Sequence, residues 1–267
     1  MNIVVLVKLA IDTGQLRFDP STYKPLIEDI PLKISDIDRN AIEEAQRLRS
    51  LGFSKVYSLT VLTWGPLNKR VQEAQSLLRE VLALGVDESI LIADESTISA
   101  ESSYTAKIIA NAIKKIGNVN LVLAGEASID KFTSQIPARV AAELNYSYTG
   151  FVRKIDVKEG RIIAERDLEN YTEIVELRMP AVIAVTREIN TPRLPTLLQI
   201  RSAMKKPLTI YKTTDLGVEM PKKLVEVSYE GIRVSRKNIV IEGKDMREKV
   251  SKLVEYLVSE GVITLKR

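Results

Sequence analysis

Residues 181–206, AVIAVTREINTPRLPTLLQIRSAMKK, change from an apolar run to a loop between two prolines and then to a helical pattern. The small and β-branched residues at 181–185 are typical of a strand buried in a sheet. Pro192 and Pro195 restrict the loop, and rigidity is useful where a loop presents a shape to a partner. Thr196 followed by Gln199 predicts a capping box that begins a short helix. The alternative is an ordinary connection with a solvated basic end.

The chain before residue 150 alternates between predicted strands and predicted helices. Apolar runs predict strands at 2–7, 56–63 and 120–124. Helical patterns are expected near 35–50, 67–84 and 101–116, and a polar loop at 125–135 leads into a further helix. Strands and helices that alternate in this way predict a parallel sheet with helices on both faces. Two short segments at 16–18 and 25–27 are expected to form a small hairpin.

The pattern changes after residue 150. Alternating apolar and polar residues at 151–157, 161–165 and 173–177 predict antiparallel strands at the edge of the sheet. Residues 208–211 predict one more strand. The tail carries an apolar helical stripe composed of Met246, Val250, Leu253, Val254, Leu257 and Val258. We therefore expect an α/β domain over 1–235, including the loop at about 187–205, and a helical arm over 236–267.

Composition excludes several classes of function. The 267 residues contain no cysteine and no histidine, so this chain alone cannot form a disulfide, a Cys/His zinc site or a Ser-His-Asp triad. The net charge of +4 is too small to argue for nucleic-acid binding. No apolar run approaches the roughly 20 residues of a membrane-spanning helix. The sequence predicts a soluble, cytoplasmic protein that holds a cofactor rather than catalysing a reaction by itself.

Four segments are expected to meet where the parallel strands end: 6–11, 35–38, 61–65 and 125–135. Each leads toward a helix, and the free N–H groups of a helix start can bind phosphate. Thr133, Ser134 and Gln135 add donors, Asp36 or Asp38 can take a ribose hydroxyl, and Gly125 is expected to let the backbone approach a ligand closely. The alternative is that these polar residues only cap helices. A glycine-rich dinucleotide fingerprint is missing after the first strand.

The segments VTREINTPRLPTLLQIRSAMKKP, ISDIDRNAIEEA and LALGVDESILI resemble the β subunit of electron transfer flavoproteins. The likeness extends over nearly the whole chain and implies an open, mostly parallel, doubly wound sheet of the Rossmann-like, adenine-nucleotide-binding type. It also implies that 187–205 is a recognition loop for flavoprotein dehydrogenases and that the arm packs on an α subunit. The docking residues that it implies are Arg193, Leu194, Thr196, Leu197 and Ile200.

The resemblance implies two cofactors. One is an FAD held mainly by the α subunit, with this chain forming a wall near Asp12 and Thr13. The other is AMP bound inside this chain. The residues implied for AMP are Leu6, Ser35, Asp36, Ile37, Asp38, Val61, Thr63, Gly125, Asp130, Thr133, Ser134 and Gln135. The pair is expected to carry electrons toward a quinone reductase.

Three alternatives stay open at this point. Electron-bifurcating relatives hold a second FAD in place of AMP, and they resemble one another in a stretch Asp-Gly-Asp-Thr. This chain has Lys131 and Phe132 at the glycine and aspartate of that stretch, which favours AMP. A stand-alone adenine-nucleotide sensor and an ATP-pyrophosphatase-like enzyme are the other two. Both need a glycine-rich phosphate loop that is absent here.

Overall fold

The fold is built on one sheet, in which the strands follow the order β11-β5-β4-β1-β6-β10-β7-β8-β9. The computed structural model describes residues 1–219, 231–232 and 236–264. The chain divides into two units, Met1–Glu230 and Gly231–Arg267, and the sheet belongs to the first. The predicted boundary after residue 235 lies outside the described residues.

Six neighbouring strands of this sheet, from β11 to β10 in the order above, are parallel. They are β1 (Asn2–Leu6), β4 (Lys55–Val61), β5 (Glu88–Ile92), β6 (Val119–Gly125), β10 (Ala181–Val185) and β11 (Leu208–Tyr211). From β1 the chain adds β4 and β5 on one side and later β6 and β10 on the other. A reversal of this kind opens a crevice beyond the carboxyl ends of the strands on either side of it. The predicted open, doubly wound α/β fold is confirmed.

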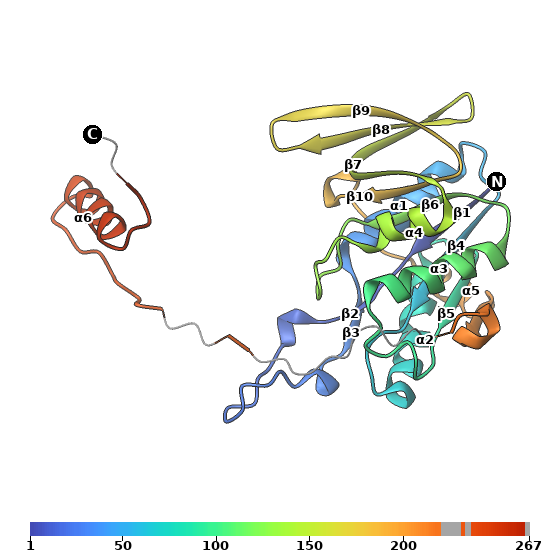
Figure 1. Ribbon diagram of the computed structural model, residues 1–267, viewed down its shortest axis with the longest axis horizontal. Helices are drawn as coiled ribbons and strands as arrows, with labels where there is room; N and C mark the ends of the chain where they lie inside the picture. The colour runs from blue at the N-terminus through green and yellow to red at the C-terminus, as the bar shows by residue number, and fades with distance from the viewer. Residues whose placement is uncertain (220–230, 233–235, 265–267) are drawn as a thin grey trace. The chain divides into compact units, whose positions relative to one another are not determined.

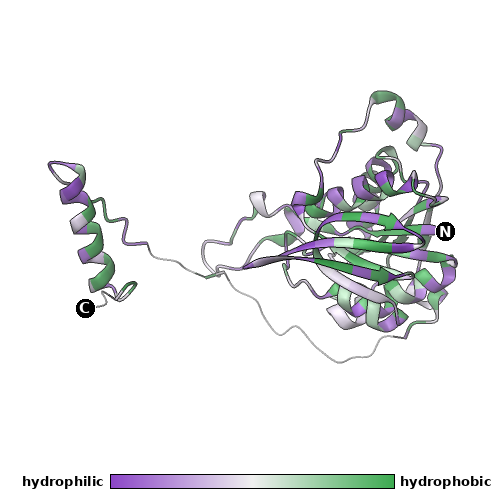
Figure 2. Cartoon of the chain, turned by 90° about the horizontal axis from the view of Figure 1, so that it is seen from above, coloured by the Kyte–Doolittle hydropathy of each residue, from purple (hydrophilic) through white to green (hydrophobic). Residues whose placement is uncertain are grey.

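Four helices cover the two faces of the parallel sheet (Figure 1). They are α1 (Asp36–Arg49), α2 (Leu67–Ala83), α3 (Ser102–Ile116) and α4 (Ile136–Leu144). Because side chains alternate along a strand, Ile3 and Val5 of β1 join the core cluster beneath α1 and α2, whereas Val4 and Leu6 join the cluster beneath α3 and α4. In Figure 2, hydrophobic stretches in green lie along strands of the sheet, next to hydrophilic residues in purple.

An antiparallel extension continues the sheet on the β10 side. It consists of β7 (Ser147–Lys158), β8 (Arg161–Leu168) and β9 (Tyr171–Arg178). Strand β7 pairs with β10 in parallel through Ser147–Val152, and farther along it pairs with β8 in antiparallel register. The predicted antiparallel edge is therefore confirmed, and one long strand joins it to the parallel part.

A two-stranded ribbon between β1 and α1 was not predicted. It pairs β2 (Leu9–Ile11) with β3 (Leu32–Ile34), and the residues between them, 12–31, are called the excursion below. Within the excursion Phe18 forms an isolated antiparallel bridge with Pro25, which confirms the small hairpin expected there. Strands of three residues are too short to show the alternation that sequence analysis relies on.

The second unit contains the predicted amphipathic helix, α6 (Met246–Ser259). Asp245 caps it by accepting a hydrogen bond from the Glu248 N–H at 2.8 Å. No residue of α6 is buried within the described part of the chain. An apolar stripe that the described residues of its own unit leave unburied is suited to bind another chain.

Candidate functional site

A cavity of about 430 Å³ lies at the carboxyl ends of the parallel strands, and all four predicted segments contribute to it. Strands β1, β4 and β6 provide its floor, and the beginnings of α3 and α4 provide its rim. Its residues are Leu6, Val7, Lys8, Asp38, Leu59, Val61, Thr63, Ala100, Glu101, Ser102, Ser103, Thr105, Ile109, Ala124, Gly125, Glu126, Ala127, Ser128, Lys131, Thr133, Ser134, Gln135, Ile136, Pro137 and Arg139.

The rim of the cavity suits an anion. Thr133, Ser134 and Gln135 immediately precede α4, and the first N–H groups of a helix have no partners within it. Lys131 and Arg139 place two cations on the same rim. Backbone donors, a helix dipole and cations together are features that suit a phosphate group.

The floor of the cavity is mostly apolar, with one free hydroxyl. Leu6, Val61, Ala124 and Ile109 line it. The Thr63 Oγ1 is buried and has no hydrogen-bond partner among the described residues. A buried hydroxyl normally has a partner, so this one is available to a bound molecule. An apolar floor with one polar group beside an anion-binding rim fits a nucleobase joined to a phosphate.

Asp38 holds the ends of β1 and β6 together. Its two carboxylate oxygens accept the Lys8 N–H at 2.7 Å and the Gly125 N–H at 3.1 Å. Burial raises the pKa of Asp38 to about 7, although both hydrogen bonds favour the ionised form. The structure thus gives Asp38 a role in closing the sheet at the crevice, whereas the sequence argument expected it to take a ribose hydroxyl.

Asp38→Asn should change how stability depends on pH. Between the unfolded pKa of 3.8 and the folded pKa of about 7, only the folded carboxyl holds a proton, so the free energy of unfolding falls as pH rises. The wild type should lose about 1 kcal/mol relative to the asparagine variant between pH 5 and pH 6. Urea unfolding of both proteins at each pH measures this. A difference that stays constant with pH would show that Asp38 is already ionised in the folded protein.

Gly125 is required by the protein itself. A Cβ at this position would lie 2.6 Å from Asp38 Oδ1 and 3.0 Å from Ile37 Cβ. The close approach of a ligand to this glycine, expected from the sequence, stays a prediction. Within the protein, the closest neighbours are the first residues of α1, which pack directly on the end of β6.

Gly125→Val should therefore destabilise the free protein, by about 1–3 kcal/mol, because the start of α1 must shift to make room. Gly14→Val is a suitable control, since a Cβ at Gly14 meets only an ordinary contact at 3.4 Å. Urea unfolding without added nucleotide tests the prediction. Equal midpoints for both variants would contradict it.

A second polar network lies beside the cavity and was not predicted. The Asp130 carboxylate accepts hydrogen bonds from Lys8 Nζ at 2.6 Å, Ser128 Oγ at 2.7 Å and Trp64 Nε1 at 2.8 Å. Burial alone would raise the pKa of Asp130, but these partners outweigh it and lower the pKa. Burial also lowers the pKa of Lys8, against the pull of Asp130. The network fixes the loop after β6 to the ends of β1 and β4.

The structure separates the predicted cofactor residues into three groups. Those that line the cavity are Leu6, Asp38, Val61, Thr63, Gly125, Thr133, Ser134 and Gln135. Those that lie next to it without lining it are Ser35, Asp36, Ile37 and Asp130. Asp12 and Thr13 lie elsewhere, at the turn where the excursion leaves β2. Ser35 precedes α1, but its side chain makes no capping hydrogen bond.

The proline-bounded loop forms a second candidate surface, and its base is fixed to α1. The buried Asn40 side chain donates to the Asn190 carbonyl at 2.7 Å, and the Asn190 side chain donates back to the Asn40 carbonyl at 3.0 Å. Arg193 is paired with Glu43 at 3.2 Å. Beyond these contacts Leu194 is 84% exposed and Leu197 is 82% exposed.

Helix α5 (Leu197–Ala203) is fixed at both ends. The predicted capping box is confirmed: Gln199 N–H donates to Thr196 Oγ1, and Thr196 N–H donates to Gln199 Oε1 at 2.8 Å. Its far end rests on α2, where Arg79 donates to the Ala203 carbonyl at 3.0 Å and to the Lys206 carbonyl at 2.7 Å. Leu197 and Ile200 are thus exposed on a helix that cannot easily move.

The described residues contain no helix that is long and apolar enough to cross a membrane. Among the same residues, no cluster of acidic side chains has an arrangement that could hold a metal ion.

Comparison with known proteins gives consistent similarities. The family described as "Electron transfer flavoprotein domain" matches residues 26–216. The electron transfer flavoprotein subunit beta of Thermoanaerobacterium thermosaccharolyticum is 35% identical over 272 residues, which cover 98% of this chain and 100% of the relative. The caffeyl-CoA reductase-Etf complex subunit CarD of Acetobacterium woodii is 31% identical over 218 residues, which cover 82% of this chain and 80% of the relative. Subunit beta of Clostridium acetobutylicum is 30% identical over 261 residues, or 97% of both chains.

Proposed function

This chain belongs to the family of electron transfer flavoprotein β subunits, and on that premise we propose that it pairs with a separate α subunit in an FAD-containing heterodimer. The heterodimer accepts electrons from flavoprotein dehydrogenases and passes them toward a quinone reductase, in the cytoplasm. The observation that carries the proposal is the similarity to a subunit beta along 98% of the chain, which includes the crevice, the proline-bounded loop and α6. This chain is an electron-carrier subunit rather than an enzyme by itself.

We assign AMP to the cavity. Its phosphate lies at the start of α4 near Thr133–Gln135, and its base rests on the apolar floor near Thr63. The volume of about 430 Å³ is near the lower end of the range for ligand sites, roughly 300–1,000 Å³, and suits a mononucleotide better than a dinucleotide. Phe132 contributes nothing to this argument: its side chain is 70% exposed and does not line the cavity.

We assign the wall of the shared FAD site to the turn at Asp12 and Thr13. The Asp12 carboxylate shapes this turn by accepting hydrogen bonds from the Gly14 backbone N–H at 3.3 Å and from the Gln15 side-chain amide at 2.7 Å. When bound, FAD supplies the capacity to take up and release electrons, and the protein binds and orients it. The exposed stripe of α6 provides a surface for the α subunit.

A second FAD in the cavity is the alternative. One relative is named as a subunit of a caffeyl-CoA reductase-Etf complex, so assembly with a reductase of that kind is a second candidate arrangement. Lys131 stands where the bifurcating stretch has glycine, and the size of the cavity also argues against a second flavin.

Purification with and without the α subunit tests the proposal. We expect the isolated chain to retain little FAD and the complex to retain one FAD and one AMP after denaturation and chromatographic separation of its nucleotides. Two FAD without AMP would select the bifurcating alternative. Stoichiometric FAD on the isolated chain would contradict the role given to the α subunit.

A further inference from the structure

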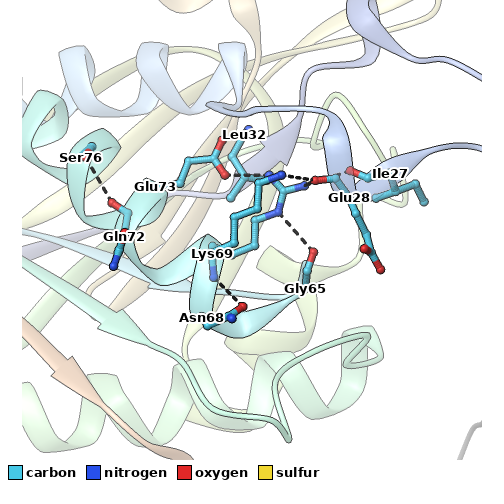
Figure 3. Close-up of polar contacts among 10 residues, drawn as sticks. Ile27, Glu28, Leu32, Gly65, Asn68, Lys69, Gln72, Glu73 and Ser76 are labelled. Carbon is cyan, nitrogen blue, oxygen red and sulfur yellow. Dashed lines mark hydrogen bonds and ion pairs between the residues drawn. The ribbon is translucent and has the colours of Figure 1, made fainter.

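A buried arginine in α2 has no part in the sites described so far. Arg70 is 0% exposed, and its guanidinium donates to four acceptors. Nη1 donates to Glu73 Oε2 at 2.7 Å, and Nε donates to the Gly65 carbonyl at 3.3 Å. Nη2 donates to the Ile27 carbonyl at 2.9 Å and to the Glu28 carbonyl at 3.4 Å. Figure 3 labels Gly65, Glu73, Ile27 and Glu28, which lie together in one network of polar contacts.

A buried ion pair is an unfavourable way to stabilise a helix. Removing two charges from water is costly, and apolar side chains of similar size often stabilise a protein equally well or better. Three of the four acceptors are backbone carbonyls, which a planar guanidinium with several fixed donors can satisfy at once. The arrangement therefore serves to hold particular backbone segments together.

Arg70 joins a backbone segment next to the cavity to a segment of the excursion. Gly65 follows β4 and lies two residues after Thr63, which lines the cavity. Ile27 and Glu28 belong to the excursion. The charge on Arg70 also positions the Glu73 carboxylate, whose other oxygen accepts the Leu32 N–H at 2.5 Å.

The residue that Glu73 contacts, Leu32, lies next to the residue that binds the turn proposed as the flavin wall. Leu32 is the first residue of β3, and the carbonyl of the preceding Pro31 accepts the Asp12 N–H at 3.0 Å. The pair formed by the buried Arg70 and the partly exposed Glu73 therefore holds the C-terminal end of the excursion directly, and the Asp12 end is joined to it through the Pro31 carbonyl. Lys69 adds a solvent-exposed hydrogen bond of 2.7 Å to the Glu28 carbonyl.

We propose that Arg70, with Glu73, is a positioning residue that fixes the excursion so that its Asp12–Gly14 turn can serve as a wall for the bound flavin. The inference deepens the proposed function and rests on it for the identity of the flavin. Without the pair, the excursion would still be tethered by the β2–β3 ribbon, but the turn at Asp12 would lose the rigid support beneath it.

Three variants of the full chain test this role. Arg70→Met removes the donors, and the double variant Arg70→Met/Glu73→Met removes both charges of the pair and keeps side chains of similar size, so that its fold is retained. Arg79→Met is the matched control: Arg79 lies on the same helix and donates to two backbone carbonyls, but those carbonyls belong to Ala203 and Lys206.

Limited trypsin digestion measures the anchoring directly. Arg17 is exposed within the excursion, and Lys158 is exposed at the end of β7 and serves as an internal reference. Loss of the charged hydrogen bonds should raise cleavage after Arg17 relative to Lys158 by roughly 10- to 100-fold in the first two variants. The Arg79 variant should cleave like the wild type. Unchanged cleavage in the double variant would overturn the anchor.

The dissociation constant of FAD from the complex with the α subunit tests whether the anchored turn contributes to flavin binding. It should rise by roughly 10-fold or more in the first two variants, and it should not change in the Arg79 control. Faster cleavage with unchanged FAD affinity would overturn the assignment of this turn to the flavin. If the wild-type complex held no FAD, the proposed function would fail, whereas the cleavage result would still decide whether Arg70 is the anchor.

Discussion

Leu197→Ala should raise the apparent KM of the heterodimer, used as the acceptor of a flavoprotein dehydrogenase, by roughly 10- to 100-fold. The estimate comes from the burial of a leucine side chain on docking, which is worth about 1.5–3 kcal/mol. Leu197 is 82% exposed in the free chain, so its truncation should leave the melting temperature near that of the wild type.

The rigidity of the loop is the reason to expect a large effect from one residue. Asn40 and Asn190 fix the entry to the loop, and the capping box fixes the start of α5. Arg79 fixes its end. Docking therefore requires little ordering of the backbone, and the binding free energy of the leucine is not spent on ordering it.

Leu51→Ala is a suitable control, because Leu51 is also exposed, at 41%, and lies outside the loop. It should alter neither the acceptor kinetics nor the flavin content. A large drop in the melting temperature of Leu197→Ala with unchanged acceptor kinetics would mean that Leu197 supports the fold and does not anchor a partner.

The parts of the fold that could be predicted are those that depend on residues close to one another in the sequence. All five residues of β10 are buried, so its sequence is a continuous apolar run. The side chains of Thr196 and Gln199 each bond to the other's backbone N–H, and their spacing alone predicts the helix start. Gly85 adopts a φ of +114°, which explains why the predicted helix ends there.

The parts that could not be predicted depend on contacts between distant residues. Lys8 and Asp130 are 122 positions apart, and neither has a local spacing that signals the pair. The hydrogen bond from the Trp64 indole to Asp130 likewise becomes visible only when the strand ends are brought together. Arg70 resembles any exposed arginine of an amphipathic helix, and only the path of the excursion over α2 buries it.

The same distinction applies to the crevice. The four backbone segments were identified because strand ends in a parallel sheet must converge, whichever residues they carry. Which side chain faces the cavity depends on the exact rotation of each turn. Ile37 packs against the end of β6, whereas Asp38, in the same turn of α1, reaches the cavity.

Asp130→Ala should lower the free energy of unfolding by roughly 3 kcal/mol, because it leaves the partly buried Lys8 ammonium without its counter-charge and the Trp64 indole N–H without an acceptor. The side chain of Asp130 is only 3% exposed, so water cannot readily replace it. The AMP content of the purified complex should fall as well, since the loop that ends at α4 is then released. Trp64 is the only tryptophan, and its fluorescence during urea unfolding reports on the transition and on the lost hydrogen bond together.

The double variant Lys8→Met/Asp130→Leu distinguishes the effect of the Lys8–Asp130 ion pair from the effect of the other hydrogen bonds that Asp130 accepts. With both charges removed, no ion remains buried, and stability should recover to within about 1 kcal/mol of the wild type, apart from the indole N–H that still lacks an acceptor. AMP content should stay low, because Lys8 no longer ties the end of β1 to the loop that carries the phosphate donors. A double variant as unstable as Asp130→Ala would show that the carboxylate acts mainly through Trp64 and Ser128, and that its pairing with Lys8 contributes little.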